Sequence, residues 1–580
     1  MLKQLAGCVR EYKRPTILTL IFIVGEAVIE TIIPFITANL VNRIKAGASI
    51  ESVMEVGLLL IIMAAISLVC GGLAGFTCAK ASTGFAKNLR SDLFHRIQTY
   101  SFENIDKFSS SSLVTRMTTD VTNVQMAFMM LIRIAIRSPL LLIFSTVMAF
   151  VMGGKLAFVF VVVIPILAFG LLAIGKKAMP AFRSVFKKYD RLNESIEENV
   201  RGMRVVKGFS REEYEKQKFN TAADNIRKDF TKAECIVALN TPLMNLCMYI
   251  NMVVVLLVGS KLAITSGGSA LDVGQISGML TYGMQILMSL MMLSMIYVMV
   301  TMSAESAKRI CEVLEEEPSL KEPENPVMEV KNGSIEFKNV NFKYSAKAKK
   351  YALSDIDLSI RSGMTVGIIG GTGSSKSSLV QLIPRLYDVT EGAVLVGGMD
   401  VRSYDIPALR SAVAMVLQKN VLFSGTIKDN LRWGNETATD EEIREACRLS
   451  QADEFIQTFP DKYDTYIEQG GSNVSGGQKQ RLCIARALLK KPKILILDDS
   501  TSAVDTKTDA LIRAGFKNYI PDTTKIIIAQ RIASVEDADL IIVMDNGSIS
   551  AAGTHEDLLQ SSDIYREVYE QQTKGGNENE

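Results

Sequence analysis

The fold is decided by the stretch Met364-Thr-Val-Gly-Ile-Ile-Gly370-Gly-Thr-Gly-Ser-Ser375-Lys376-Ser377, a short apolar run that opens into a glycine-rich loop and then a helix. Such a loop turns several backbone N–H groups toward one point, ahead of a helix N-terminus whose partial positive charge attracts anions. The spacing matches the P-loop pattern G-x-x-x-x-G-K-[ST], in which the lysine reaches the terminal phosphates and the hydroxyl takes one place on Mg²⁺. The stretch therefore predicts a site for ATP and Mg²⁺, with these nucleotide-binding residues: Gly370, Gly371, Thr372, Gly373, Ser374, Ser375, Lys376, Ser377 and Ser378.

One position of this loop departs from the pattern, because Ser375 stands where the last glycine is expected. Glycine lets the backbone approach a phosphate closely, whereas a Cβ atom at this position crowds it. A glycine-rich loop alone is also compatible with a surface turn. Two segments further along the chain favour the nucleotide site.

The first of these segments is Lys493-Ile-Leu-Ile-Leu-Asp498-Asp499, an apolar run that ends in two carboxylates. So apolar a strand is expected to be buried on both faces of a parallel sheet. Open α/β sheets bind ligands at the carboxyl ends of their strands, so we expect Asp498 to hold Mg²⁺ through water, on the same ion as Ser377.

The second segment, Asn473-Val-Ser475-Gly476-Gly477-Gln478-Lys-Gln-Arg481, opens a helix with a serine and two glycines. It is a second anion-binding arrangement in the same small domain. Two phosphate sites in one domain make sense if one of them serves the nucleotide of another molecule.

The composition divides the chain of 580 residues into an apolar first half and a polar second half. The net charge of +2 comes from finely mixed acidic and basic residues, which gives no reason to expect nucleic acid as a partner. The eight cysteines are scattered without a C-x-x-C pair, so neither a metal site nor a disulfide framework is predicted.

Six apolar stretches are each long enough to cross about 30 Å of hydrocarbon. They lie at about 15–42, 54–79, 129–152, 155–175, 238–263 and 276–303. Lys and Arg concentrate before the first span and in the long connections after the second and the fourth, which places these segments and both chain ends in the cytoplasm. The short outer loops and the lack of targeting segments favour a bacterial plasma membrane.

The predicted fold class is a multi-domain membrane protein: an all-α six-helix transmembrane domain with long cytoplasmic helical extensions, followed by an α/β P-loop ATPase domain. The predicted parts are a cytoplasmic helix at 1–14, the transmembrane domain at 15–310, a linker at 311–333, the nucleotide-binding domain at 334–572 and a disordered tail at 573–580. The tips of the two cytoplasmic connections, 102–109 and 209–214, are predicted to contact an ATPase domain. The alternative is that they are solvated helical hairpins.

Two membrane features are candidates for a substrate cavity. Glu26 and Glu30 lie four residues apart, hence on one helix face, and intramembrane carboxylates are costly. A role in binding a cationic substrate and a structural hydrogen bond near Pro34 both remain open. Met288 and Met295 belong to a methionine stripe on the last span, which suits either promiscuous apolar binding or plain helix packing.

With these motifs in place, nearly the whole chain resembles the ATP-binding cassette (ABC) transporters of exporter type, in the half-transporter layout. The most specific mark is the signature Val474-Ser475-Gly476-Gly477-Gln478, which ends 20 residues before Asp498. The resemblance implies that Tyr344 stacks on adenine, that Gln418 senses Mg²⁺ and that Ser502-Ala-Val-Asp505 is the D-loop. It also implies a partner site made of these residues: Ser475, Gly476, Gly477, Gln478 and Asp505.

The departures from the family pattern concern the catalytic residues. Asp499 stands where the family usually has a glutamate that polarises the attacking water, and it is one methylene, or about 1.5 Å, shorter. Gln530 stands where the family has its switch histidine. Losing a positioned general base typically costs about 10²–10⁴-fold in rate, so this site is expected to bind ATP and hydrolyse it poorly.

A degraded P-loop side combined with an intact signature resembles one subunit of a heterodimeric bacterial multidrug exporter. The expected partners are a second half-transporter, the lipid bilayer and a small amphipathic substrate such as a drug or a lipid. Three alternatives remain open: a regulatory subunit that clamps its partner without turnover, a homodimeric exporter, and an importer of a metal chelate with the same fold.

Overall fold

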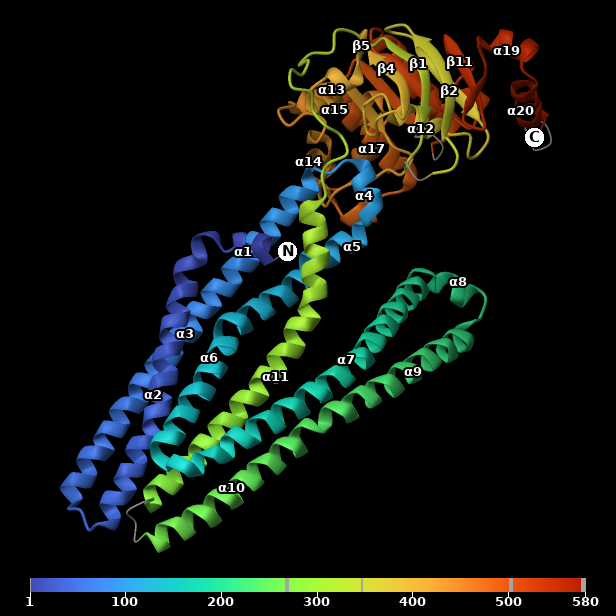
Figure 1. Ribbon diagram of the computed structural model, residues 1–580. Coiled ribbons are helices and arrows are strands. Elements are labelled where there is room, and N and C mark those ends of the chain that lie inside the picture. Colours follow the sequence, from blue (N-terminus) through green and yellow to red (C-terminus); the bar gives the residue numbers. More distant parts are fainter. Residues whose placement is uncertain (1, 267–270, 346–347, 500–503, 575–580) are drawn as a thin grey trace. The chain divides into compact units, whose positions relative to one another are not determined.

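The computed structural model describes residues 2–266, 271–345, 348–499 and 504–574. The chain forms two compact units, Met1–Gln98 with Ser109–Glu316, and Thr99–Phe108 with Glu317–Glu580. We call them the helical unit and the α/β unit (Figure 1).

The helical unit is built from long helices joined by short turns (Figure 1). Its elements are α1 (Leu2–Gly7), η1 (Arg10–Tyr12), α2 (Lys13–Lys45), α3 (Ile50–Gln98), α5 (Ser110–Thr115), η2 (Arg116–Asp120), α6 (Val121–Gly153), η3 (Gly154–Ala157), α7 (Phe158–Arg201), α8 (Met203–Gly208), α9 (Glu212–Ala238), α10 (Asn240–Thr265) and α11 (Val273–Glu315). The predicted cytoplasmic helix at 1–14 corresponds to α1, η1 and the first residues of α2. The six predicted spans fall on α2, α3, α6, α7, α10 and α11.

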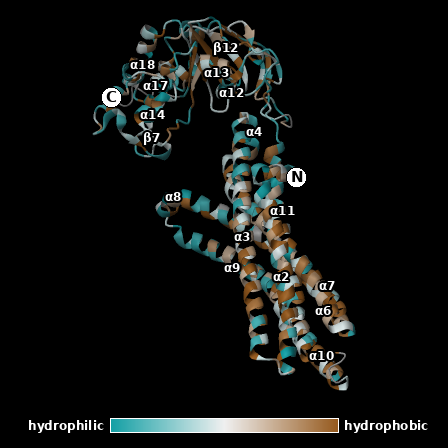
Figure 2. Cartoon of the chain, turned by 90° about the vertical axis from the view of Figure 1, so that its left-hand side faces the viewer, coloured by the Kyte–Doolittle hydropathy of each residue, from teal (hydrophilic) through white to brown (hydrophobic). Residues whose placement is uncertain are grey.

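Within the described residues, five helical runs are long and apolar enough to cross a membrane. One of them, Ser110–Phe182, contains two of the predicted spans, because α6 and α7 lie on either side of a turn at Gly154. Gly154 has φ +50°, a conformation open to glycine but strained for other residues. Figure 2 shows the hydrophobic colour concentrated on the spanning helices and hydrophilic residues around α8 and α9.

The α/β unit contains a six-stranded sheet in the order β12-β11-β3-β10-β9-β6. Its strands are β3 (Thr365–Gly370), β6 (Val413–Val416), β9 (Ile494–Asp498), β10 (Thr524–Ile528), β11 (Leu540–Asp545) and β12 (Ser548–Gly553). All neighbours pair in parallel except β12, which is antiparallel to β11 at one edge. Alternate residues of β9 face two different hydrophobic cores, Leu495 and Leu497 one, Ile494 and Ile496 the other. The expected burial of this strand on both faces is therefore confirmed.

A second, four-stranded sheet runs in the order β2-β1-β4-β5 and packs against one of these cores. Its strands are β1 (Ile335–Phe342), β2 (Leu353–Ile360), β4 (Glu391–Val396) and β5 (Met399–Asp400), and a small pair is formed by β7 (Gly425–Thr426) and β8 (Tyr466–Ile467). The α-helices that follow β3 in this unit are α12 (Lys376–Gln381), α13 (Ile406–Ala412), α14 (Ile427–Arg432), α15 (Asp440–Leu449), α16 (Asp453–Ile456), α17 (Gly476–Leu489), α18 (Thr506–Tyr519), α19 (His555–Ser561) and α20 (Asp563–Lys574). Helix α20 reaches Lys574, and the rest of the predicted tail lies outside the described residues.

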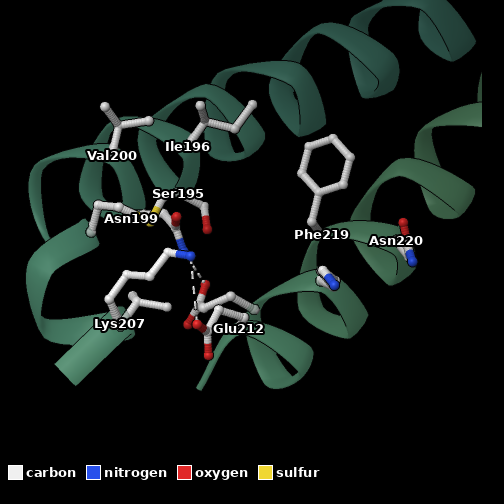
Figure 3. A pocket seen from close by; sticks show the side chains of 12 residues that line it. Ser195, Ile196, Asn199, Val200, Lys207, Glu212, Phe219 and Asn220 are labelled. Atoms are coloured by element: carbon white, nitrogen blue, oxygen red, sulfur yellow. Dashed lines mark hydrogen bonds and ion pairs between the residues drawn. The ribbon is translucent and has the colours of Figure 1, made fainter. Parts of the chain in front are cut away.

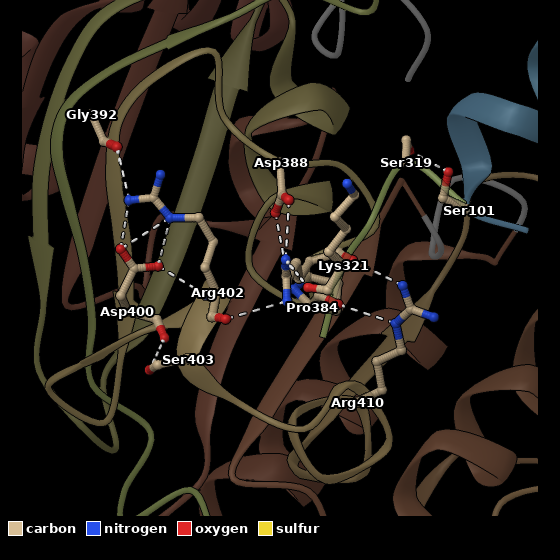
Figure 4. Close-up of polar contacts among 11 residues, drawn as sticks. Ser101, Ser319, Lys321, Pro384, Asp388, Gly392, Asp400, Arg402, Ser403 and Arg410 are labelled. Atoms are coloured by element: carbon tan, nitrogen blue, oxygen red, sulfur yellow. Dashed lines mark hydrogen bonds and ion pairs between the residues drawn. The ribbon is translucent and has the colours of Figure 1, made fainter. Parts of the chain in front are cut away.

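The α/β unit also includes α4 (Phe102–Phe108), the tip of the first cytoplasmic connection. The Tyr387 hydroxyl donates to the Asp106 carboxylate over 2.7 Å, and the Asn104 amide donates to the Glu317 carbonyl over 3.0 Å. The Arg385 guanidinium, which is 3% exposed, donates to the Lys321 carbonyl over 3.0 Å (Figure 4). These contacts fasten both α4 and the start of the linker to the same unit.

Candidate nucleotide site

Four predicted site segments meet at one edge of the six-stranded sheet. The P-loop follows β3, Gln530 lies two residues after β10, Asp498 ends β9 and Gln418 lies two residues after β6. Because β3, β10, β9 and β6 are consecutive parallel neighbours, their carboxyl ends lie side by side. Ligands bind at this edge of open α/β sheets.

The P-loop curls around the ammonium group of Lys376. This group donates to the carbonyls of Gly370 and Gly371, each over 2.8 Å, and to the Ser374 hydroxyl over 3.3 Å. A Cβ atom on Gly370 would lie 2.2 Å from the Met544 carbonyl oxygen, so only glycine fits there. The remaining predicted loop residues, Thr372, Gly373, Ser375, Ser377 and Ser378, lie in the turn and in the first residues of α12.

Ser375 precedes α12 in a left-handed conformation, with φ 69° and ψ 25°. A side chain in this region costs about 1–2 kcal/mol relative to glycine, because its Cβ approaches the following carbonyl. The serine therefore keeps the loop geometry of a glycine at the expense of backbone strain.

The Ser377 hydroxyl donates to the Asp498 carboxylate over 2.9 Å, which unites the two expected Mg²⁺ ligands. Burial raises the pKa of the Asp498 carboxyl and lowers the pKa of the Lys376 ammonium. Both groups are thus poorly solvated in their charged forms, and a bound cation and phosphates would supply the missing counter-charges. The pair is a fitting set of donors for Mg²⁺, whose preferred ligands are oxygens.

Asp499 is held by two side-chain amides. Its Oδ2 atom accepts from the Gln530 amide over 2.8 Å and from the Gln418 amide over 3.3 Å. The residue is 9% exposed and has φ +47°, so its backbone also lies in the left-handed region. The three predicted catalytic residues are thus in contact, and one oxygen of the carboxylate that would face the attacking water is occupied.

Tyr344 lies beside the loop, where an adenine ring is expected. Its hydroxyl is 2.7 Å from the Ser378 hydroxyl, and its side chain is 42% exposed. The ring meets Phe342 and Tyr387 edge to face, with centroids 4.8 and 5.2 Å away. This arrangement leaves part of the aromatic surface available for stacking.

The predicted signature forms the N-terminus of α17. Ser475 and Gln478 form a capping box, in which the Gln478 backbone N–H donates to the Ser475 hydroxyl over 3.3 Å and the Ser475 N–H to the Gln478 side chain over 2.9 Å. Val474 is buried, whereas Ser475 and Gly476 are exposed. The buried Val474 and the capping box fix the N-terminal end of α17 and leave it accessible. Gly477, next in the chain, is partly exposed.

Asp505, predicted for the same partner site, caps α18 and accepts the Thr508 backbone N–H over 2.9 Å. It is exposed. Ser502 and Ala503 of the predicted D-loop lie outside the described residues.

In the helical unit, Glu26 and Glu30 share a partner that the sequence reasoning missed. Arg137 of α6 is 2.6 Å from the Glu30 carboxylate and 3.5 Å from that of Glu26. A signal was present, because Arg133 and Arg137 repeat on α6 the spacing of four that the two glutamates have on α2. The carboxylates therefore have a structural partner in this chain.

Met288 and Met295 of α11 are 53% and 63% exposed in the single chain. Side chains so exposed are accessible to an apolar substrate. Promiscuous apolar binding and plain helix packing both remain open for the stripe.

The tip of the second cytoplasmic connection lies between α8 and α9. A cavity of about 680 Å³ is enclosed by α7, α8 and α9, with Ile196, Val200 and Phe219 among its lining (Figure 3). Among the lining residues, Lys207 approaches Glu212 at 3.7 Å. The cavity lies in the helical unit and contains none of the predicted nucleotide residues.

Comparison with known proteins accounts for both units. Residues 16–290 match the family model of the ABC transporter transmembrane region, and residues 353–502 match the ABC transporter family model. The chain is 36% identical over 555 residues to the ABC transporter ATP-binding protein YfiB of Bacillus subtilis, covering 96% of each chain. This chain belongs to the ABC transporter family.

The chain is also similar to other ABC transporters in sequence and in fold. Identity to the ATP-binding protein Rv1273c of Mycobacterium tuberculosis is 35% over 564 residues, again covering 96% of each chain. The fold matches that of a bacterial Atm1-family ABC exporter solved with ATP bound, with a TM-score of 0.85 at 23% identity over 97% of this chain and 99% of the other. The resemblance to ABC transporters and the predicted fold class are confirmed: the chain is a multi-pass half-transporter with an ATP-binding domain. Membership of the family implies ATP hydrolysis coupled to transport.

Proposed function

We propose that this ABC transporter chain is the degenerate-site subunit of a heterodimeric exporter. Its own P-loop holds ATP, and its signature completes the hydrolytic site of a partner half-transporter. The observation that carries the proposal is the engagement of the Asp499 carboxylate by Gln530 and Gln418. A carboxylate that already accepts two hydrogen bonds and is one methylene short is a poor base for water.

The signature side supports the second half of the proposal. Ser475 and Gln478 satisfy each other, and the exposed N-terminus of α17 presents backbone N–H groups to an anion from another molecule. One chain therefore combines a weak hydrolytic half-site with a sound signature.

For the substrate we propose small amphipathic compounds such as drugs or lipids. The exposed methionines of α11 suit apolar molecules of varied shape. The pairing of Glu26 and Glu30 with Arg137 weakens the case for a purely cationic substrate, since both carboxylates already face a guanidinium. We further propose that both chain ends lie in the cytoplasm, on the distribution of Lys and Arg, and that the membrane is a bacterial plasma membrane, on the short outer loops.

The test is to purify the tagged chain from its host in mild detergent and to identify any stoichiometric second chain by mass spectrometry. We expect a second six-span ATPase with a glutamate and a histidine at the positions of Asp499 and Gln530. A complex of this chain alone that still hydrolyses ATP would overturn the proposal in favour of a homodimer.

A further inference from the structure

The last helix of the chain reaches back to the segment that carries Gln530. Helix α20 ends at Lys574 near the C-terminus (Figure 1), and Gln572 lies in its last turn. The Gln572 side-chain amide makes two hydrogen bonds: the Ile532 backbone N–H donates to its oxygen over 2.9 Å, and its nitrogen donates to the Gln530 carbonyl over 2.8 Å. One side chain thus bridges the backbone on both sides of Arg531.

The two hydrogen bonds of Gln572 involve backbone groups that lie beyond the end of β10. Strand β10 ends at Ile528, and the last ladder-like bond joins the Ala529 N–H to the Ile368 carbonyl over 3.2 Å. The backbone groups of Gln530 and Ile532 therefore need other partners, and Gln572 provides one for each.

Helix α20 is itself well anchored. Tyr565 is fully buried, its hydroxyl is 2.7 Å from His555 Nδ1, and its backbone N–H donates to the Ser562 hydroxyl over 3.3 Å. Val568 and Tyr569 pack against the hydrophobic core that contains Leu495 and Leu497 of β9. Gln572 therefore belongs to a helix that is packed against the rest of the α/β unit.

Beyond the backbone bridge, the Gln530 side chain reaches Asp499 over 2.8 Å. A continuous series of hydrogen bonds therefore joins α20 to the carboxylate beside the phosphate cradle. Movement of Gln572 would release the backbone that aims the Gln530 amide.

We propose that Gln572 is a positioning residue, which holds Gln530 against Asp499 and so determines how long the chain's own site retains ATP. The inference rests on the proposed function, in which this site stores ATP rather than turning it over. It adds the C-terminal helix to the parts that control the site.

The test compares Gln572→Met with Gln571→Met in the full purified complex. Methionine keeps the length and helix propensity of glutamine and removes its amide. Gln571 is the matched control, because its amide bonds to Glu567 of the same helix, 3.3 Å away. The complex is loaded with photoreactive 8-azido-[α-³²P]ATP, chased with unlabelled ATP and cross-linked, and the label remaining in this chain is measured against time.

We expect Gln572→Met to speed the loss of label about tenfold, as the modest net contributions of two hydrogen bonds imply. Gln571→Met should leave the rate unchanged, and label in the partner chain should decay equally in both variants. Combining Gln572→Met with Gln530→Ala should be no faster than Gln530→Ala alone, because the two residues act in series.

Equal retention in the two variants, or additive effects of Gln572→Met and Gln530→Ala, would overturn the inference. Failure of the proposed function has a different mark, since it appears in the unsubstituted complex. There, [γ-³²P]-labelled nucleotide on this chain would lose its label by hydrolysis as fast as nucleotide on the partner.

Discussion

Asp499 is the residue on which the proposed storage of ATP at this site depends. Its carboxylate lies at the end of β9 beside Asp498, in the place where a water would be activated, but the Gln530 and Gln418 amides bind the same oxygen. The two amides thus occupy an oxygen that a water would otherwise approach.

Restoring both residues should restore hydrolysis. In Asp499→Glu with Gln530→His, the longer carboxylate reaches further and loses its strongest amide partner, so we expect ATP hydrolysis at this site to rise by about 10²-fold. Phosphate release is measured in a complex whose partner P-loop lysine is substituted, which isolates this site. No gain would assign the defect to Ser375 or to the partner's signature.

Ser375 makes a separate contribution through the backbone. With φ 69° it is strained by about 1 kcal/mol relative to glycine, so Ser375→Gly should raise the melting temperature. Because glycine has no Cβ atom to crowd a phosphate, Ser375→Gly should also tighten ATP binding. Titration with a fluorescent ATP analogue measures the change. Asn546→Gly is the control, because Asn546 has φ +47° in the turn between β11 and β12. It should raise the melting temperature without changing affinity, and equal gains in affinity from both variants would contradict a local effect.

At the level of elements, the nucleotide site was largely predictable. The apolar runs before Gly370 and Asp499 identified parallel strands, and parallel strands bring their carboxyl ends together, which is where the structure places the P-loop and Asp498. The contact of Gln530 with Asp499 depends on β10 lying between β3 and β9, and no local pattern encodes that order. Gln572 was missed because an exposed glutamine in a helix has no distinguishing signal.

The membrane helices were predictable as elements and not as contacts. Length and hydropathy located the long helices on which the six predicted spans fall, but the partner of Glu30 depends on the packing of α6 against α2. Arg137 can be read from the sequence, but the sequence does not say which neighbouring helix its side chain contacts.

The ion pair between α2 and α6 gives a prediction at this scale. Glu30→Gln leaves Arg137 with the more distant Glu26, so we expect a lower melting temperature, because an unbalanced charge among apolar helices is costly. The exchange Glu30→Arg with Arg137→Glu should recover most of the loss. Glu55→Gln, at an exposed position of α3, is the control and should change little. A stable Glu30→Gln variant with altered substrate selectivity would instead favour a substrate-binding role.

For the whole molecule, we propose an asymmetric pair of half-transporters. In this proposal the chain contributes a site that stores ATP and a signature that works for its partner. The two contributions lie on different elements, since the P-loop precedes α12 and the signature opens α17, so substitutions separate them cleanly. A subunit that merely clamps its partner would need the first contribution only.

The most direct measurement is the steady-state ATP hydrolysis of the purified complex carrying Ser475→Ala or Asp499→Ala in this chain. We expect Ser475→Ala to lower hydrolysis by at least about tenfold, since it removes the cap that presents α17 to the partner's nucleotide. We expect Asp499→Ala to leave hydrolysis within about twofold of the unsubstituted complex. The reverse pattern, with normal hydrolysis in Ser475→Ala and a loss in Asp499→Ala, would contradict the account and assign the hydrolytic site to this chain.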